Sequence, residues 1–131
     1  MLTVTHLKIK EFETVVVGKD RVTGLHGIIA VHSTKRGPSL GGIRMWPYEN
    51  QKEALQDVLR LAGAMTKKAA ISGLPMGGGK AVIIGDPGKE KSRDLLHSLG
   101  DLIEYLQGQY IGAKDSGLLP AELDVVSGRT G

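Results

Sequence analysis

The chain has 131 residues, of which 40% are hydrophobic and 24% are charged, as in an ordinary soluble globular protein of one domain. Its net charge is +3, but the basic residues are scattered and few aromatic residues could stack on bases, which argues against nucleic-acid binding. Cysteine is absent, which excludes disulfides, thiolate metal sites and cysteine nucleophiles. Because no segment resembles a signal peptide or a membrane span, we expect a cytoplasmic protein without membrane association.

The first part of the chain contains two strand patterns and a glycine-rich segment. Residues 1–11 predict a short helix or an irregular lead-in. Residues 12–17 and 25–32 are rich in β-branched residues, and the polar cluster at 18–20 favours a turn between them, so they predict a hairpin. Residues 33–48 lack periodicity and indicate a shaped loop. The backbone N–H groups of Gly41 and Gly42 could bind a carboxylate there, although a simple turn is the commoner explanation for paired glycines.

A helix is predicted to begin after Asn50, a candidate N-cap with Glu53 three residues later. Apolar residues then recur at helical spacing as far as Met65. The pattern ends near Lys67 and Lys68, where the helix dipole favours a cation. This favourable placement explains one of the two lysines without any functional role.

The second part of the chain alternates between strand and helix patterns. Residues 68–71 predict a short extended segment, 72–79 an irregular loop, and 81–84 a strand covered on both faces. A turn at 86–88, a leucine-rich helix at about 92–107 and a strand at 109–113 follow, and the alternation predicts the α/β class. Asp115 comes just after the last strand and is a site candidate, although turn-forming aspartates are commoner. The histidines show no metal-ligand spacing.

Chemistry, if the chain performs any, is expected between residues 66 and 87. Lys68 and Lys80 flank a glycine-rich turn there, and Lys80 directly precedes the buried strand. Partial burial and a neighbouring cation both disfavour the ammonium form, which favours Lys80 as a general base. The simpler alternative is a surface lysine after an ordinary turn. A phosphate-binding loop is excluded, because Lys80 is followed by Ala81 and no glycine stands five residues before Gly79.

Three motifs carry a family resemblance: GPSLGGIRMW at 37–46, AMTKKAAISGLPMGGGKAVIIGDP at 64–87 and YIGAKDSG at 110–117. In this order they resemble the amino-terminal domain of the leucine, phenylalanine, valine and glutamate dehydrogenases, with the leucine and phenylalanine branch closer. The resemblance covers about residues 10–117. It implies that residues 1–131 form one substrate-binding and dimerisation domain, with a single open mixed sheet flanked by helices. It also implies a homo-oligomer, formed through an open sheet edge.

The resemblance further implies a reaction and the residues that perform it. In the family, NAD accepts a hydride from the α-carbon of an L-amino acid, and water converts the resulting imine to a 2-oxo acid and ammonia. Lys68 matches the lysine that holds the substrate carboxylate, and Lys80 matches the general base that activates water. Asp115 matches the acid that handles the amino group.

The resemblance also assigns the substrate pocket. Gly41 and Gly42 match the glycines beside the carboxylate-binding lysine. Met65 lies where the family lines its substrate pocket, and Leu40 and Ala113 match positions that contact the apolar side chain of the substrate in the leucine branch. Which amino acid is preferred is left open.

The sequence departs from the family pattern in two places. Lys114 and Ser116 flank Asp115 where the leucine branch tends to carry an acidic residue and valine, which could alter the position or acidity of Asp115. No G-x-G-x-x-G motif occurs, and the only G-x-G, at 77–79, precedes its strand. We therefore expect the cofactor-binding Rossmann domain to be absent from this chain, and the isolated chain to be inactive unless another chain supplies that domain.

Two functions remain open. The chain is either the substrate and oligomerisation half of an amino-acid dehydrogenase, or a stand-alone non-catalytic oligomerising domain that acts as an amino-acid sensor or regulatory partner. In both cases the expected small-molecule ligand is an L-amino acid or a 2-oxo acid. A degenerate remnant without a ligand is disfavoured, because the two lysines and Asp115 are all retained.

Overall fold

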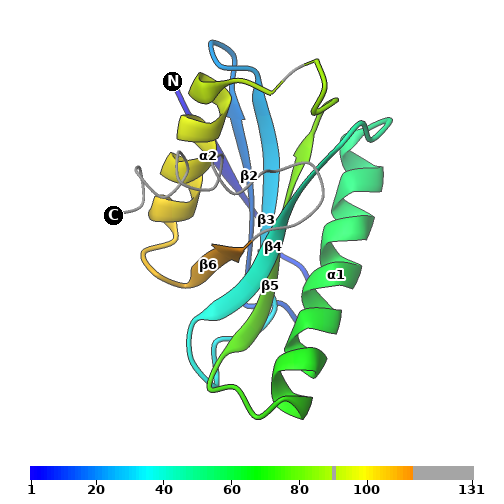
Figure 1. Cartoon of the computed structure of the whole chain (residues 1–131), viewed down its shortest axis with the longest axis vertical. Coiled ribbons are helices and arrows are strands. Elements are labelled where there is room, and N and C mark those ends of the chain that lie inside the picture. Colours follow the sequence, from blue (N-terminus) through cyan, green and yellow to red (C-terminus); the bar gives the residue numbers. More distant parts are fainter. Residues whose placement is uncertain (90, 114–131) are drawn as a thin grey trace.

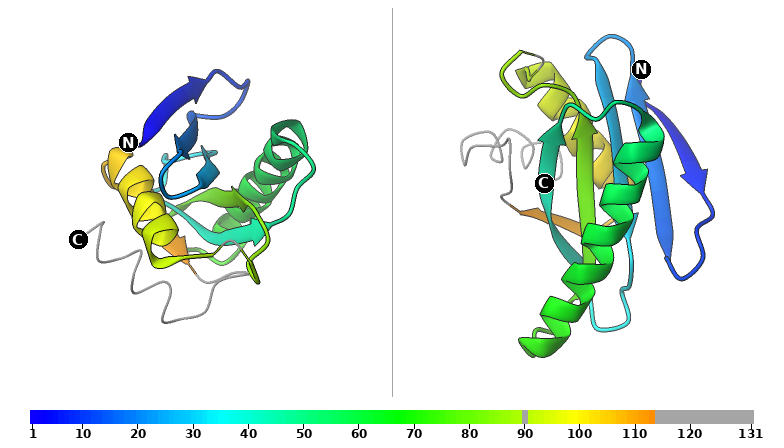
Figure 2. Two further views of the ribbon diagram at one scale, coloured as in Figure 1. Left: turned by 90° about the horizontal axis from the view of Figure 1, so that it is seen from above. Right: turned by 90° about the vertical axis from the view of Figure 1, so that its right-hand side faces the viewer.

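The computed structural model describes residues 1–89 and 91–113, the last three as backbone only. In this part of the chain, one six-stranded sheet with the order β1-β2-β3-β5-β4-β6 lies between two helices (Figures 1 and 2). No described helix is long and apolar enough to cross a membrane. The elements are β1 (Thr3–Leu7), β2 (Thr14–Asp20), β3 (Leu25–Val31), β4 (Ser39–Trp46), α1 (Gln51–Ile71), β5 (Gly77–Ile84), α2 (Arg93–Tyr105) and β6 (Tyr110–Ala113).

The sheet is mixed and open. β1, β2, β3 and β5 pair with one another in antiparallel fashion, whereas β4 runs parallel to both β5 and β6. The parallel neighbours β4 and β5 are joined by α1, because a parallel pair needs a long crossover connection. The predicted α/β class and the open mixed sheet flanked by helices are confirmed.

Each face of the sheet carries its own apolar core. Along β5, Val82 belongs to the core beneath α1, while Ala81 and Ile83 belong to the core beneath α2. All three side chains are fully buried. This burial on both faces explains the unbroken apolar run that predicted a covered strand.

Helix α1 begins as predicted but ends later. The Asn50 side chain accepts a hydrogen bond of 2.8 Å from the Glu53 N–H, which caps the first turn. The helix then continues to Ile71, so the prediction of an extended segment at 68–71 was wrong. Ala69 is buried under this last turn, and alanine and lysine favour helix. The site candidate Lys68 therefore lies on α1.

Two strands were missed in the first part of the chain. Residues 3–7 form β1, which pairs with β2, in place of the predicted helix or irregular lead-in. The shaped loop predicted at 33–48 contains β4, whose Gly41 and Gly42 lie inside the strand. Glycine pairs usually mark turns, but here Gly41 permits the close approach of the β5 backbone at Gly79.

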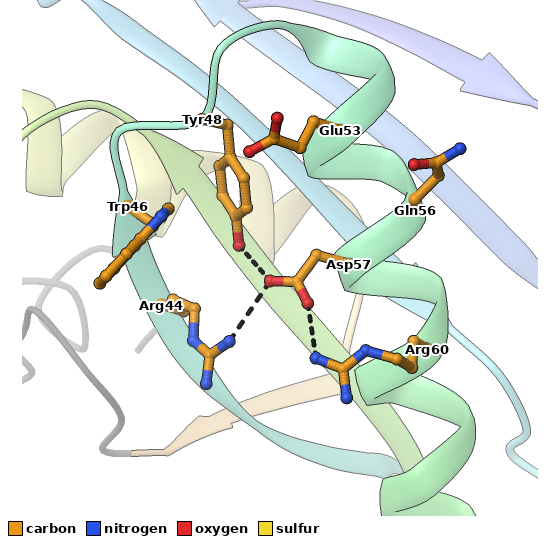
Figure 3. A pocket seen from close by; sticks show the side chains of 7 residues that line it. All are labelled: Arg44, Trp46, Tyr48, Glu53, Gln56, Asp57 and Arg60. Atoms are coloured by element: carbon orange, nitrogen blue, oxygen red, sulfur yellow. Dashed lines mark hydrogen bonds and ion pairs between the residues drawn. The ribbon is translucent and has the colours of Figure 1, made fainter.

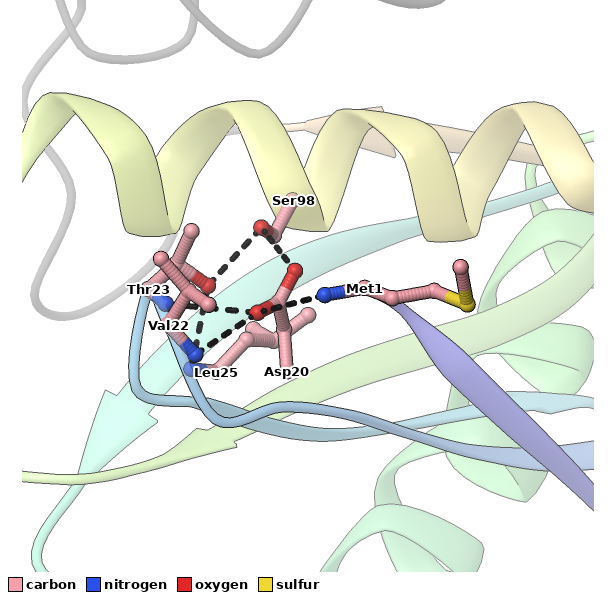
Figure 4. A network of polar contacts seen from close by, with 6 residues as sticks. All are labelled: Met1, Asp20, Val22, Thr23, Leu25 and Ser98. Carbon is pink, nitrogen blue, oxygen red and sulfur yellow. Dashed lines mark hydrogen bonds and ion pairs between the residues drawn. The ribbon is translucent and has the colours of Figure 1, made fainter.

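The β2–β3 hairpin is confirmed, with its turn later than predicted. Residues 18–20 continue β2, and the chain turns at 21–24, where Gly24 has a φ of +83°. The carboxylate of Asp20 accepts hydrogen bonds from the backbone N–H groups of Val22 and Thr23 and from the Ser98 hydroxyl on α2 (Figure 4). Asp20 thus fixes the hairpin turn to α2.

Candidate functional site

Lys80 is buried, with 6% of its surface exposed, on the side of β5 that faces α1. Side chains alternate along a strand, so Lys80 shares a face with Gly78 and Val82. Val82 packs in the core beneath α1, and a Cβ added to Gly78 would lie 2.0 Å from the backbone nitrogen of Thr66 on α1. Lys80 therefore faces the space beneath the C-terminal half of α1.

Helix α1 contacts β5 directly at Gly78. The added Cβ of Gly78 would also lie 2.6 Å from the carbonyl carbon of Met65, so the two backbones meet with no side chain between them. Beside this crossing, the His32 ring nitrogen Nδ1 lies 2.7 Å from the Thr66 hydroxyl. The His32 N–H donates to the Gly78 carbonyl at 3.0 Å. Met65 thus lies at the level of Gly78, two residues along β5 from Lys80.

Lys68 is exposed and lies on the flank of α1 nearer β4. It follows Asp57 by eleven residues, about three helical turns, so the two side chains share a flank. Asp57 forms an ion pair of 3.3 Å with Arg44 on β4. Since α1 runs back along β4, moving from Asp57 to Lys68 corresponds to moving from Arg44 towards Leu40.

The β4 candidates divide between the two faces of the sheet. Arg44 faces α1, so Leu40 and Gly42, four and two residues earlier, face α1 as well. Gly41 faces the other way, and a Cβ added to it would lie 1.7 Å from the Gly79 carbonyl oxygen. The α1 face therefore brings together five of the predicted site residues: Leu40, Gly42, Met65, Lys68 and Lys80.

Two predicted residues lie at or beyond the end of the described chain. The backbone of Ala113 pairs with Gly42 at the end of β6. Asp115, the proposed acid, lies outside the described residues, as do its neighbours Lys114 and Ser116. The assignment of these residues remains a prediction.

Comparison with known proteins identifies the family. Residues 6–130 match the family model described as "Glu/Leu/Phe/Val dehydrogenase, dimerisation domain". The chain belongs to this family.

Individual relatives agree with the family match. The chain is 47% identical over 120 residues to leucine dehydrogenase from Bacillus subtilis, covering 92% of this chain and 33% of the relative. It is 50% identical over 115 residues to valine dehydrogenase from Streptomyces virginiae, covering 88% and 32%. The crystal structure of L-tryptophan dehydrogenase from Nostoc punctiforme superposes with a TM-score of 0.88 at 39% identity, covering 92% and 36%. The chain thus spans about one third of the length of these relatives.

The G-x-G of this family member lies inside a strand and not at a turn into a helix. A pyrophosphate-binding loop needs glycines at a turn from a strand into a helix. The only G-x-G, at 77–79, lies inside β5, where all three glycines are buried. Nor do the described residues include a group of three His, Asp or Glu side chains that could hold a metal ion.

A hollow of about 620 Å³ lies away from these residues, nearer the N-terminal end of α1 (Figure 3). At its centre, Asp57 accepts hydrogen bonds from Tyr48 at 2.5 Å, from Arg60 at 2.8 Å and from Arg44 at 3.3 Å. Burial alone would raise the pKa of Asp57, but these donors hold it below its usual value. Trp46 forms part of the wall and is 54% exposed. The sequence did not single out this cluster.

Other contacts near the site had no signal in the sequence. Tyr110 belongs to the third family motif, yet nothing in that motif indicates that its hydroxyl reaches β4. The contact of the His32 ring with the Thr66 hydroxyl was likewise not indicated by the sequence. These contacts join residues 34 to 69 positions apart, beyond the reach of local patterns.

Proposed function

We propose that this chain is the substrate-binding and oligomerisation domain of an NAD-dependent L-amino-acid dehydrogenase of the leucine and phenylalanine dehydrogenase type. The reaction is the reversible oxidative deamination of an L-amino acid to a 2-oxo acid and ammonia. The observation that supports this best is that Lys80 is buried on the face of the sheet that α1 covers, where Gly42 also lies. Lys68 lies on α1 itself, and the chain belongs to this family.

In the proposed site, Lys68 binds the substrate carboxylate, because its exposed ammonium group can pair with it. The apolar side chain of the substrate contacts Leu40, Met65 and Ala113. Lys80 acts as the general base and takes a proton from the water that adds to the imine carbon. Asp115 donates a proton to the nitrogen that leaves as ammonia.

In the proposed reaction, hydride transfer requires NAD. NAD would be held by a dinucleotide-binding domain, on the same or another polypeptide, and would accept the hydride from the α-carbon. We propose that these 131 residues without such a domain do not reduce NAD. The alternative is a non-catalytic oligomerising domain that acts as an amino-acid sensor or regulatory partner. Adding a family dinucleotide-binding domain separates the two, because only the dehydrogenase half would then reduce NAD.

Oligomer formation is part of the proposal. β1 ends the described sheet, so the outer backbone groups of β1 are available for pairing with another strand. We expect a homo-oligomer formed through this edge. Light scattering should give at least a dimer mass, and a monomer at all concentrations would contradict this part of the proposal.

Calorimetric titration with L-leucine and with 4-methyl-2-oxopentanoate tests ligand binding. Lys68→Ala should raise the Kd at least about tenfold, because it removes the cation that pairs with the carboxylate. The matched control is Lys67→Ala, the adjacent exposed lysine, which lies about 100° around α1 from Lys68 and should change the Kd less than about twofold. Equal effects of the two variants, or no heat with the wild type, would contradict the proposal.

A further inference from the structure

The hydroxyl of Tyr110 contacts two successive backbone carbonyls of β4. Tyr110 begins β6, is 2% exposed and belongs to the core beneath α2. Its hydroxyl lies 2.8 Å from the carbonyl oxygen of Gly41 and 2.8 Å from that of Gly42. A hydroxyl has a single proton, so the two carbonyls share it in a three-centre hydrogen bond.

The absence of side chains makes room for this arrangement. A Cβ added to Gly79 of β5 would lie 2.8 Å from the Tyr110 ring, so Gly79 leaves space for the ring. Gly41, on the same face, lets the Gly79 carbonyl approach β4 closely. Gly79 thus makes room for the Tyr110 ring, and Gly41 makes room for the Gly79 carbonyl.

The pairing between β4 and β5 is interrupted at the same place. β4 pairs with β5 as far as Leu40 and again from Ile43 onwards, in an unchanged register. Between them, Gly41 and Gly42 are paired with β6 and not with β5. In a continuous parallel ladder, the Gly42 N–H would donate to the Gly79 carbonyl, and both missing pairs depend on this bond.

These observations indicate how the peptide between Gly41 and Gly42 is oriented. In a regular strand, successive carbonyls point towards opposite neighbouring strands. Here the register keeps the Gly41 carbonyl directed at β6 and the Gly42 carbonyl at β5, and both also lie within hydrogen-bond distance of one hydroxyl on the α2 face. A trans peptide holds its N–H opposite its C=O, and no described peptide is cis. The Gly42 N–H is therefore turned towards the α1 face, where Lys80 lies.

We propose that Tyr110 is a positioning residue that turns the Gly42 N–H towards the α1 face, where this N–H donates to the carboxylate of the substrate. The inference rests on the proposed function, because it assumes that an amino acid or 2-oxo acid occupies that face. The Gly42 N–H, together with Lys68 and Lys80 on this face, would form an anion-binding site. A ligand with a carboxylate should therefore bind more tightly there than a neutral analogue. Tyr110 itself touches neither the substrate nor the reacting atoms.

Tyr110→Phe removes the hydroxyl and keeps the ring in its core. With L-leucine as the probe, we expect the calorimetric Kd to rise about tenfold. With L-leucinamide, which lacks the carboxylate, the Kd should change less than about twofold. Tyr48→Phe is the matched control, because it removes a hydroxyl that donates to Asp57 at 2.5 Å, outside the proposed site. This control should leave the Kd for L-leucine within about twofold of the wild type.

A second measurement does not depend on the variant folding. In the wild type, the amide resonance of Gly42 should move on addition of L-leucine and move less with L-leucinamide. An unmoved Gly42 amide, an unchanged Kd in folded Tyr110→Phe, or equal weakening of both ligands would overturn the inference. Wild-type protein that binds no L-leucine would instead overturn the proposed function, and the role of Tyr110 with it.

Discussion

Gly78 leaves room for the backbone of α1, which occupies the space that a Cβ at this position would need. The nearest atoms to that Cβ, at 2.0 to 2.6 Å, belong mainly to the backbone of α1 and cannot rotate away. The glycine therefore sets how closely α1 approaches β5, and with it the height of Met65 and Lys68 above Lys80. The positions of Met65 and Lys68 therefore depend on Gly78 as well as on their own side chains.

Alanine substitutions at Gly78 and Gly63 should have opposite effects. Gly78→Ala should lower the free energy of unfolding by about 3 kcal/mol, since α1 must move away from the sheet. Gly63→Ala is the control. Gly63 lies on α1, and apart from the helix's own backbone no atom lies within 4 Å of the added Cβ. It should raise the free energy of unfolding by about 0.5 to 1 kcal/mol, because alanine favours helix. Urea denaturation measures both, and wild-type stability of Gly78→Ala would contradict the close seating of α1.

The sequence predicted the chemistry of individual residues better than their surroundings. Lys68 and Lys80 stood out because the motif around them is specific to the family. In the structure Lys68 lies on α1, and Lys80 lies on the face of the sheet that α1 covers. The hydroxyl of Tyr110 and the contact of His32 with Thr66 could not be predicted. They depend on which strands become neighbours, and that information is absent from local spacing.

At the level of elements, Asp57 joins α1 to β4 and to the connection between them. It accepts from Arg44 on β4, from Tyr48 in the connection and from Arg60 one turn along α1. Burial disfavours the charge of Tyr48 as well, and together with the hydrogen bond to Asp57 this raises the pKa of Tyr48, which keeps its hydroxyl a donor. The ion pair therefore holds the half of α1 that precedes the proposed site.

Asp57→Asn should lower stability in a pH-dependent way. The pKa of Asp57 is depressed in the folded state, so its contribution is present above the unfolded value of about 3.9 and is lost as the pH falls through the lower folded value. We expect the variant to be less stable by about 1 to 2 kcal/mol near pH 7. The difference should shrink below about pH 4. Urea denaturation at several pH values measures this, and a difference that stays constant down to pH 3 would contradict the assignment.

The elements themselves were predicted unevenly. Helix starts could be predicted, because Asn50 and Ser92 cap α1 and α2 through their own side chains. β4 was missed because its glycine pair is typical of a turn, although the backbone of β5 leaves no room for a side chain at Gly41. β1 was missed because it is short and gains its pairing only from β2. Elements that are determined by their own residues could be predicted, and elements that depend on pairing with a distant segment could not.

At the scale of the whole molecule, the two faces of the sheet have different roles. The α2 face is closed by a continuous apolar core that includes Leu99, Leu102 and Tyr110. The α1 face carries an apolar core nearer the start of α1 and the predicted site residues towards its end. The proposed site thus lies on the face opposite to the α2 core. Tyr110 packs in that core, and its hydroxyl contacts the backbone of β4.

The most direct test is a crystal structure of this chain with 4-methyl-2-oxopentanoate. The account predicts ligand density between α1 and the strands β4 and β5, with the carboxylate near Lys68 and the Gly42 N–H and the oxo group near Lys80. Density in the hollow beside Trp46 and Arg60 instead, or on the α2 face, would contradict it.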